Sequence, residues 1–153
     1  MSNRIVILVG TMTGTAEIVA EDIRDMCKAE GWEAELLLMD DLDCSVFERE
    51  GTFLICTSTY GQGDVPDNAI KLYEKLGKER PDLSAVRYGV IALGDRAYTD
   101  TYTFGGLRFD KLLSELHAVR IGTICQHDAS SEGVPEEAGV AWARTWLKDI
   151  QAK

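Results

Sequence analysis

The stretch IVILVGTMTGTAE at positions 5–17 constrains the fold of this chain more than any other. Its first five residues are all apolar and mostly β-branched, which is typical of a central parallel strand buried on both faces. Gly10 ends this run, and from Ala16 apolar residues recur at helical spacing until Gly31. The sequence therefore predicts a buried strand, a short loop and an amphipathic helix, in that order.

The loop at 11–15 is suited to binding a phosphate group. It offers backbone N–H groups and threonine hydroxyls at a predicted helix N-terminus, where the helix dipole is positive. It contains no Lys or Arg, and it lacks both the G-K-[ST] ending of P-loop hydrolases and the G-x-G-x-x-G dinucleotide fingerprint. The pattern favours a monophosphate held by neutral donors, and the structural alternative is a Thr/Gly-rich turn that only caps a helix.

The same order of buried strand and small-residue loop occurs twice more, at 52–64 and at 88–106. Further strand-like runs and helical faces alternate along the chain, at 34–39, 69–76, 109–116, 119–125 and 139–150. With right-handed crossovers, this alternation predicts an α/β fold in which a doubly wound parallel sheet of five strands lies between two layers of helices. The chain, 1–153, is expected to form a single domain.

The charge of the chain disfavours two classes of partner. A formal net charge of -10 argues against nucleic acid and against an anionic membrane surface, since both require clustered Lys and Arg. The charge is also unevenly distributed, because residues 11–67 hold 14 acidic and 3 basic residues, a net of -11. This acidic half of the domain indicates steering toward a basic protein surface, and solubility alone is the alternative.

The sequence also bears on the location of the protein and on the state of its cysteines. No apolar run approaches the roughly 18 residues that span a bilayer, and no secretory signal is recognisable, so a cytoplasmic location is expected. The four cysteines, Cys27, Cys44, Cys56 and Cys125, show no C-x-x-C spacing. They are interpreted as reduced packing residues, and no metal site is expected.

Taken together, the three loops resemble those of short-chain bacterial flavodoxins, and they are also similar to the FMN-binding domains of diflavin reductases such as the sulfite reductase flavoprotein. The resemblance is carried by TMTGTAE at 11–17, by STYGQGD at 58–64 with Pro66 and Asp67 after it, and by LGD at 93–95 together with Tyr98 and the Gly105-Gly106 pair. It implies the flavodoxin strand order 2-1-3-4-5, with FMN at the edge where the three loops meet.

The resemblance also implies which residues bind the cofactor. The loop at 11–16 would hold the phosphate, Tyr60 and Tyr98 would lie near opposite faces of the flavin ring, and Gly61 would offer its carbonyl to the N5 edge. The full set is Thr11, Met12, Thr13, Gly14, Thr15, Ala16, Ser58, Thr59, Tyr60, Gly61, Gly63, Leu93, Gly94, Asp95, Tyr98, Tyr102, Phe104, Gly105 and Asp128.

Two departures from the family pattern affect this set. Ala16 stands where many flavodoxins have a threonine, so one hydroxyl contact to the phosphate is lost. The segment at 98–105 is one residue longer than in stand-alone relatives, which leaves open whether Tyr102 or Phe104 covers the ring edge.

The function that the resemblance implies is electron transfer. A monomeric carrier would take single electrons from an NAD(P)H-dependent flavodoxin or ferredoxin reductase and pass them to a redox protein that the sequence does not identify, and no catalytic residues are needed. The alternative is an FMN-dependent NAD(P)H quinone or nitro-compound reductase. A receiver domain shares the sheet order but needs acidic residues after the first strand, where this chain has Gly10-Thr11.

Overall fold

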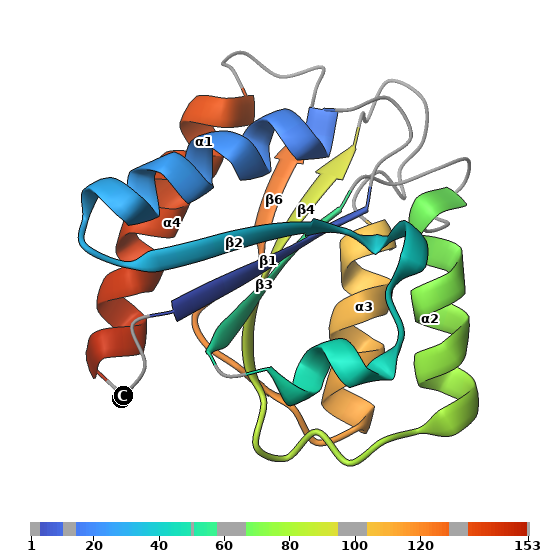
Figure 1. The fold of residues 1–153 in the computed structure, drawn as a ribbon. Helices are drawn as coiled ribbons and strands as arrows, with labels where there is room; N and C mark the ends of the chain where they lie inside the picture. Colours follow the sequence, from blue (N-terminus) through green and yellow to red (C-terminus); the bar gives the residue numbers. More distant parts are fainter. Residues whose placement is uncertain are drawn as a thin grey trace.

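A parallel sheet runs through the centre of the protein, shown by the computed structural model in Figure 1. The structure describes residues 4–10, 15–49, 51–57, 67–94, 104–128 and 135–152. The strands are ordered β2-β1-β3-β4-β5, with β6 also paired to β4, and every pairing is parallel. This order confirms the doubly wound flavodoxin-like topology. The strand bounds are β1 (Arg4–Gly10), β2 (Glu33–Leu38), β3 (Thr52–Thr57), β4 (Arg87–Gly94), β5 (Val119–Arg120) and β6 (Cys125–Asp128).

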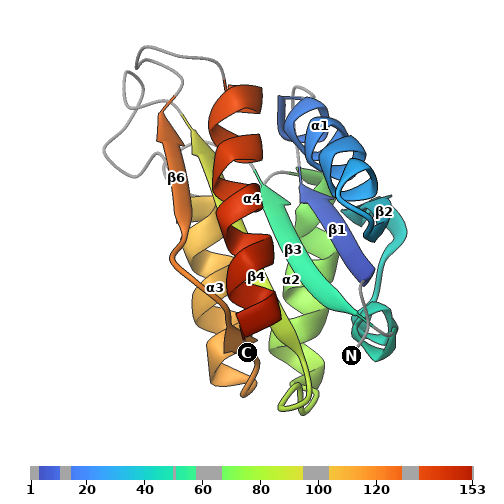
Figure 2. The same cartoon turned by 90° about the vertical axis from the view of Figure 1, so that its left-hand side faces the viewer.

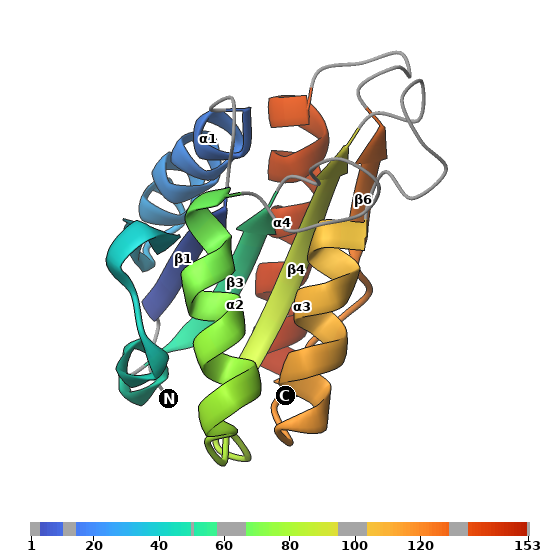
Figure 3. The same cartoon turned by 90° about the vertical axis from the view of Figure 1, so that its right-hand side faces the viewer.

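Helices cover both faces of the sheet and give the expected three layers. On one face lie α1 (Thr15–Ala29) and α4 (Pro135–Ala152), side by side in Figure 2. On the other face lie α2 (Asp67–Glu79) and α3 (Phe104–Glu115), seen in Figure 3, with the 3₁₀ turns η1 (Met39–Asp41) and η2 (Cys44–Glu48) beside them. Each face has its own apolar core, because the central strands are buried on both sides.

The first helix ends where the sequence predicts. Gly31 has a φ of 88°, a left-handed conformation that glycine adopts without a Cβ penalty. The Trp32 N–H donates to the carbonyl oxygen of Cys27 at 2.9 Å, and the Gly31 N–H donates to that of Lys28 at 3.2 Å. These two bonds form a Schellman motif, which satisfies the last carbonyls of α1 and turns the chain into β2.

The fifth strand differs from the single run expected at 119–125. It is divided into β5 and β6, because four residues, 121–124, stand opposite only two residues of β4, 89–90. Two extra residues therefore bulge from the ladder, and Gly122, with a φ of 76°, makes the bend. The local alternation at 119–125 does not reveal this bulge. Its consequence is that β6 continues to Asp128, which pairs with Gly94 at the end of β4.

Within the described ranges, no helix is long and apolar enough to cross a membrane. All four cysteines are free, with Cys27 and Cys56 buried. Among the same residues, no group of three or more His, Cys, Asp and Glu side chains is arranged to hold a metal ion.

Candidate functional site

The candidate site lies at the edge of the sheet where the parallel strands end. β1 ends at Gly10 and β3 at Thr57, and these two residues are paired. β4 ends at Gly94 and β6 at Asp128, which are also paired. Four strand ends therefore lie along one edge, and Figure 2 shows their arrowheads pointing the same way.

Each strand end is followed by the start of a helix at this same edge. α1 begins at Thr15 after β1, α2 at Asp67 after β3, α3 at Phe104 after β4, and α4 at Pro135 after β6. The N-termini of helices carry partial positive charge and free N–H groups. This edge is therefore the place in the fold where the helix dipoles favour an anionic ligand.

The winding of the chain changes direction between β1 and β3. From β1 the chain crosses to β2 through α1 on one face, whereas from β3 it crosses to β4 through α2 on the other face (Figures 2 and 3). In open α/β sheets this switch point leaves a crevice outside the strand ends, and ligands bind there.

Gly10 is required by close packing directly at this switch point. A Cβ atom on Gly10 would lie 2.6 Å from Oγ1 of Thr57, 3.0 Å from Cβ of Ala69 and 3.3 Å from Sδ of Met39. Thr57 is a polar residue with no exposed surface, and it lies at the end of β3 after four apolar residues, 53–56. Side chains from β3, α2 and η1 thus fill the space under the end of β1.

Ala16 lies in the first turn of α1 and is fully buried. The thiol of Cys56 on β3 donates a hydrogen bond to the Ala16 carbonyl oxygen at 3.4 Å. Burial raises the pKa of this thiol far above its ordinary range, so the sulfur stays protonated and keeps the donor. This hydrogen bond connects the start of α1, the predicted phosphate-binding helix, to β3.

The predicted residues on the far side of the switch point also flank the edge. Leu93 is buried on β4, and Gly94 and Asp128 are paired as the last residues of their strands. Phe104 and Gly105 open α3. A Cβ on the next residue, Gly106, would lie 2.4 Å from Cβ and 2.9 Å from Cα of Ala92, so a glycine allows α3 to approach β4 here.

The structure thus places seven of the predicted site residues along this edge: Thr15, Ala16, Leu93, Gly94, Phe104, Gly105 and Asp128. The other twelve lie outside the described residues, and their roles stay predictions: Thr11, Met12, Thr13, Gly14, Ser58, Thr59, Tyr60, Gly61, Gly63, Asp95, Tyr98 and Tyr102. The choice between Tyr102 and Phe104 likewise stays open.

Asn68 contributes to the frame of the site, although the sequence analysis gives it no role. Its Nδ2 donates to the carbonyl oxygen of Val9 at 3.3 Å and to Oδ2 of Asp40 at 3.4 Å. The first turn of α2 is thereby connected to the end of β1 and to η1. A polar residue just before the helical face expected at 69–76 was the available signal, but the partners of Asn68 are distant in sequence.

Comparisons with known proteins agree with this geometry. The family profile described as flavodoxin matches residues 7–142. The chain is 38% identical over 147 residues to Flavodoxin YqcA of Pectobacterium carotovorum, covering 96% of this chain and 97% of that one. The chain belongs to the flavodoxin family. Flavodoxins are electron carriers rather than enzymes, so the reductase alternative is not supported.

Two further likenesses define the relationship. The fold matches a point mutant of a flavodoxin from Pseudomonas aeruginosa with a TM-score of 0.84 and 30% identity, over 97% of this chain and 99% of that one. The chain is also 37% identical over 151 residues to the sulfite reductase [NADPH] flavoprotein alpha-component of Vibrio parahaemolyticus, covering 98% of this flavodoxin and 23% of that protein. Both resemblances expected from the motifs are confirmed.

Proposed function

We propose that this flavodoxin binds FMN non-covalently and carries single electrons from an NAD(P)H-dependent flavodoxin or ferredoxin reductase to a redox protein. The observation that supports this most directly is the pairing of Gly10 with Thr57 at the β1/β3 switch point, with the N-terminus of α1 following at the same edge. The likeness to a sulfite reductase [NADPH] flavoprotein is consistent with an NAD(P)H-linked donor.

The described residues fit the phosphate end of FMN. α1 has no cationic side chain before Arg24, its tenth residue. A phosphate at the first turn of α1 would therefore be held by N–H groups, hydroxyls and the helix dipole. The buried Ala16, fixed to Cys56, leaves the backbone of this turn in a defined position. Thr11, Thr13 and Thr15 would supply the hydroxyls, and the backbone of 11–16 the N–H groups.

The ring end of FMN would be held by the loops that follow β3 and β4. Tyr60 and Tyr98 would pack against the two faces of the ring, and Gly61 would direct its carbonyl to the N5 edge. Bound FMN supplies the one-electron chemistry, and this chain's residues bind it, orient it and exclude water. Asp128, beside Gly94, would disfavour added negative charge near the ring.

The proposal extends to the state of the protein in the cell. We propose that residues 1–153 act as one monomeric domain in the cytoplasm. Four free cysteines, two of them buried, are consistent with a reducing compartment. Size-exclusion chromatography with light scattering would give a mass near 16.9 kDa for a monomer.

Flavin affinity tests the proposal. FMN is expected to bind much more tightly than riboflavin, because the loop at 11–16 has no role without a phosphate. Thr13→Ala is expected to weaken FMN binding by about 1 to 2 kcal/mol, the scale of one hydrogen bond to a charged acceptor, and to leave riboflavin binding unchanged.

The matched control is Thr145→Ala, an exposed threonine on α4, which is expected to leave both affinities unchanged. Fluorescence quenching of each flavin gives the dissociation constants. Equal affinity for FMN and riboflavin in the parent protein would contradict the assignment. Steady-state NAD(P)H oxidation by the isolated protein should be negligible, since a carrier needs a separate reductase.

A further inference from the structure

The strand β2 forms one side edge of the sheet. It lies at the end of the strand order and pairs only with β1 (Figure 2). The two strands are aligned without interruption, from Glu33 opposite Arg4 to Leu38 opposite Val9. In the described part of the chain, no other main-chain hydrogen bond reaches residues 33–37. Every second residue of β2 therefore directs its N–H and C=O groups outward, away from the sheet.

The opposite side edge of the sheet carries the features that prevent a further strand from adding to a sheet. β5 has two residues, β6 has four, and the bulge at 121–124 interrupts the ladder between them. Arg120 places a cation on the same edge. Short strands, bulges and charged side chains are the usual means of blocking a sheet edge. β2, in contrast, has six residues and contains no bulge, proline or lysine, so its main chain is open to pairing.

The side chains of β2 leave room for a neighbour on both faces of the sheet. Ala34 and Leu36 pack against the core under α1, whereas Glu35 and Leu37 lie on the other face, since successive side chains of a strand alternate. All four are half-buried, and Leu38 is 41% exposed. An added strand would cover these side chains on their outer side. Apolar residues on its α1 face and charged residues on its other face would match this alternation.

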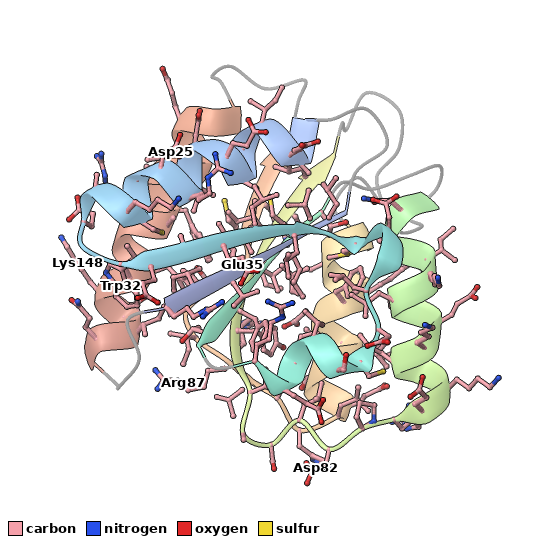
Figure 4. All side chains as sticks on the ribbon, viewed as in Figure 1. Asp25, Trp32, Glu35, Asp82, Arg87 and Lys148 are labelled. Carbon is pink, nitrogen blue, oxygen red and sulfur yellow. The ribbon has the colours of Figure 1, made fainter. Side chains whose placement is uncertain are left out.

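The charge of this edge defines the kind of neighbour. Residues 33–49, which include β2, η1 and η2, hold six acidic residues and one basic residue, a net of -5. Glu35 (Figure 4) accepts hydrogen bonds from Arg4 at 2.6 Å and from Arg49 at 3.0 Å, so the net charge is still -4 when Arg4 is included. Glu33 is exposed and forms no ion pair with a described residue. Pairing with a second copy of this chain would bring like charges together, whereas a basic strand would meet opposite charge.

We propose that the outer edge of β2 binds an extended basic segment of a partner protein, in which Lys or Arg alternates with apolar residues. The segment adds one strand to the sheet. Main-chain hydrogen bonds to β2 supply the affinity, its apolar side chains cover Leu36 on the α1 face, and its cations face Glu33 and Glu35 on the other face. The interaction needs no flavin, so the proposal does not depend on the flavin assignment.

The probe for the test is the peptide KVKVKVK, blocked at both ends and titrated into the protein in the presence of FMN, with ¹H–¹⁵N NMR as the readout. The backbone amides of 33–38 are expected to shift together and to saturate, and those that point outward are expected to exchange more slowly with solvent. The peptide KVKPKVK carries the same charge, but its proline disrupts strand pairing, so it is expected to bind at least about tenfold more weakly. The acidic peptide EVEVEVE is expected to bind more weakly still, because its charges repel those of the edge.

A charge reversal on β2 separates edge pairing from attraction to the net charge of the protein. Glu33→Lys is expected to weaken binding of KVKVKVK by about threefold to tenfold, because it replaces an attraction by a repulsion. Glu115→Lys makes the same change of charge at an exposed position at the end of α3, and this matched control should bind the peptide as the parent does. Absence of a saturable shift at 33–38, binding of KVKPKVK or EVEVEVE as tight as that of KVKVKVK, or equal effects of the two substitutions would overturn the proposal. Shifts at 33–38 that depend on protein concentration without any peptide would assign the edge to a second copy of the chain and would overturn it as well.

Discussion

At the scale of single residues, His117 is held in a backbone conformation that suits it poorly. Its φ is 77°, and the hydrogen bond from the Ala118 N–H to the Leu113 carbonyl oxygen, at 3.0 Å, fixes it there at the end of α3. Left-handed backbone costs a residue with a Cβ about 1 to 2 kcal/mol, whereas glycine adopts it freely. His117→Gly is therefore expected to raise the free energy of unfolding by about 0.5 to 1 kcal/mol, after allowance for the greater unfolded-state entropy of glycine.

Urea unfolding of the parent protein and the variant measures this difference. His117→Ala is the control, because it removes the side chain and keeps the strained φ. If the alanine and glycine variants had equal stability, relief of backbone strain could not be the cause. His117 is exposed, and no local sequence pattern signals its positive φ.

At the scale of elements, two helical glycines have opposite roles. Gly106 in α3 has no room for a Cβ, which would meet Ala92 at 2.4 Å, whereas Gly77 in α2 is exposed and has no atom within 4 Å. Gly106→Ala is expected to destabilise the protein by about 1 to 3 kcal/mol through overpacking. Gly77→Ala is expected to stabilise it by up to about 1 kcal/mol, because alanine is the better helix former.

Urea denaturation of the parent and of both variants shows whether the free energy of unfolding falls in Gly106→Ala and rises in Gly77→Ala. Loss of stability in Gly77→Ala, or a gain in Gly106→Ala, would contradict the packing that separates them. The Gly105-Gly106 pair entered the sequence analysis only as part of a family motif, and the structure supplies a physical reason for the second glycine.

The divided fifth strand is held by two tryptophans of α4. The Trp146 indole donates to the buried carbonyl oxygen of Ile121 at 3.0 Å, and the Trp142 indole donates to that of Thr123 at 3.2 Å in an exposed position. Trp146→Phe leaves a buried acceptor without its partner, so we expect a loss of about 1 to 3 kcal/mol or more in the free energy of unfolding. Trp142→Phe also removes an indole N–H, but here water can donate to the exposed carbonyl oxygen of Thr123 in its place. We therefore expect the free energy of unfolding to fall by less than about 1 kcal/mol.

The two variants serve as controls for each other, and chemical denaturation compares them directly. Equal losses would show that the indole bonds do not support the bulge. The dependence of the bulge on Trp142 and Trp146 also explains why the sequence did not predict the division of the fifth strand. Periodicity located the central strands to within about one residue, whereas α3 and α4 begin five and four residues before the helical faces expected at 109–116 and 139–150. The bulge at 121–124 depends on donors some twenty residues away.

At the scale of the whole molecule, the place of the site could be predicted and its inner contacts could not. The alternation of strands and helices requires loops at the carboxyl ends of the strands, and the observed pairing of Gly10 with Thr57 follows from it. The supporting contacts of Cys56, Thr57 and Asn68 were not foreseen, because each depends on how separate segments pack. The roles of Tyr60 and Tyr98 came from family resemblance alone.

The uneven charge of the whole molecule leads to a prediction about its encounter with the proposed reductase. Residues 11–67 carry a net charge of -11, and much of this charge is exposed on α1 and around η1 and η2. Such a field steers a basic partner and can raise association rates by roughly 10 to 1,000-fold at low salt. We expect the second-order rate of reduction, measured by stopped flow, to fall at least about tenfold as the Debye length shortens from about 30 to 10 Å.

Charge-neutralising variants locate the effect. Asp22→Asn and Asp25→Asn on α1 are expected to lower the rate at low salt and to make its dependence on ionic strength shallower, while the rate at high salt stays near that of the parent, since screening has already removed the long-range attraction there. Glu74→Gln on α2, an exposed acidic residue outside 11–67, is the control and should change the slope much less. A rate in the parent protein that does not depend on salt would count against steering by the acidic half of the domain. Equal effects of all three substitutions would assign the steering to the total net charge rather than to the acidic surface of α1.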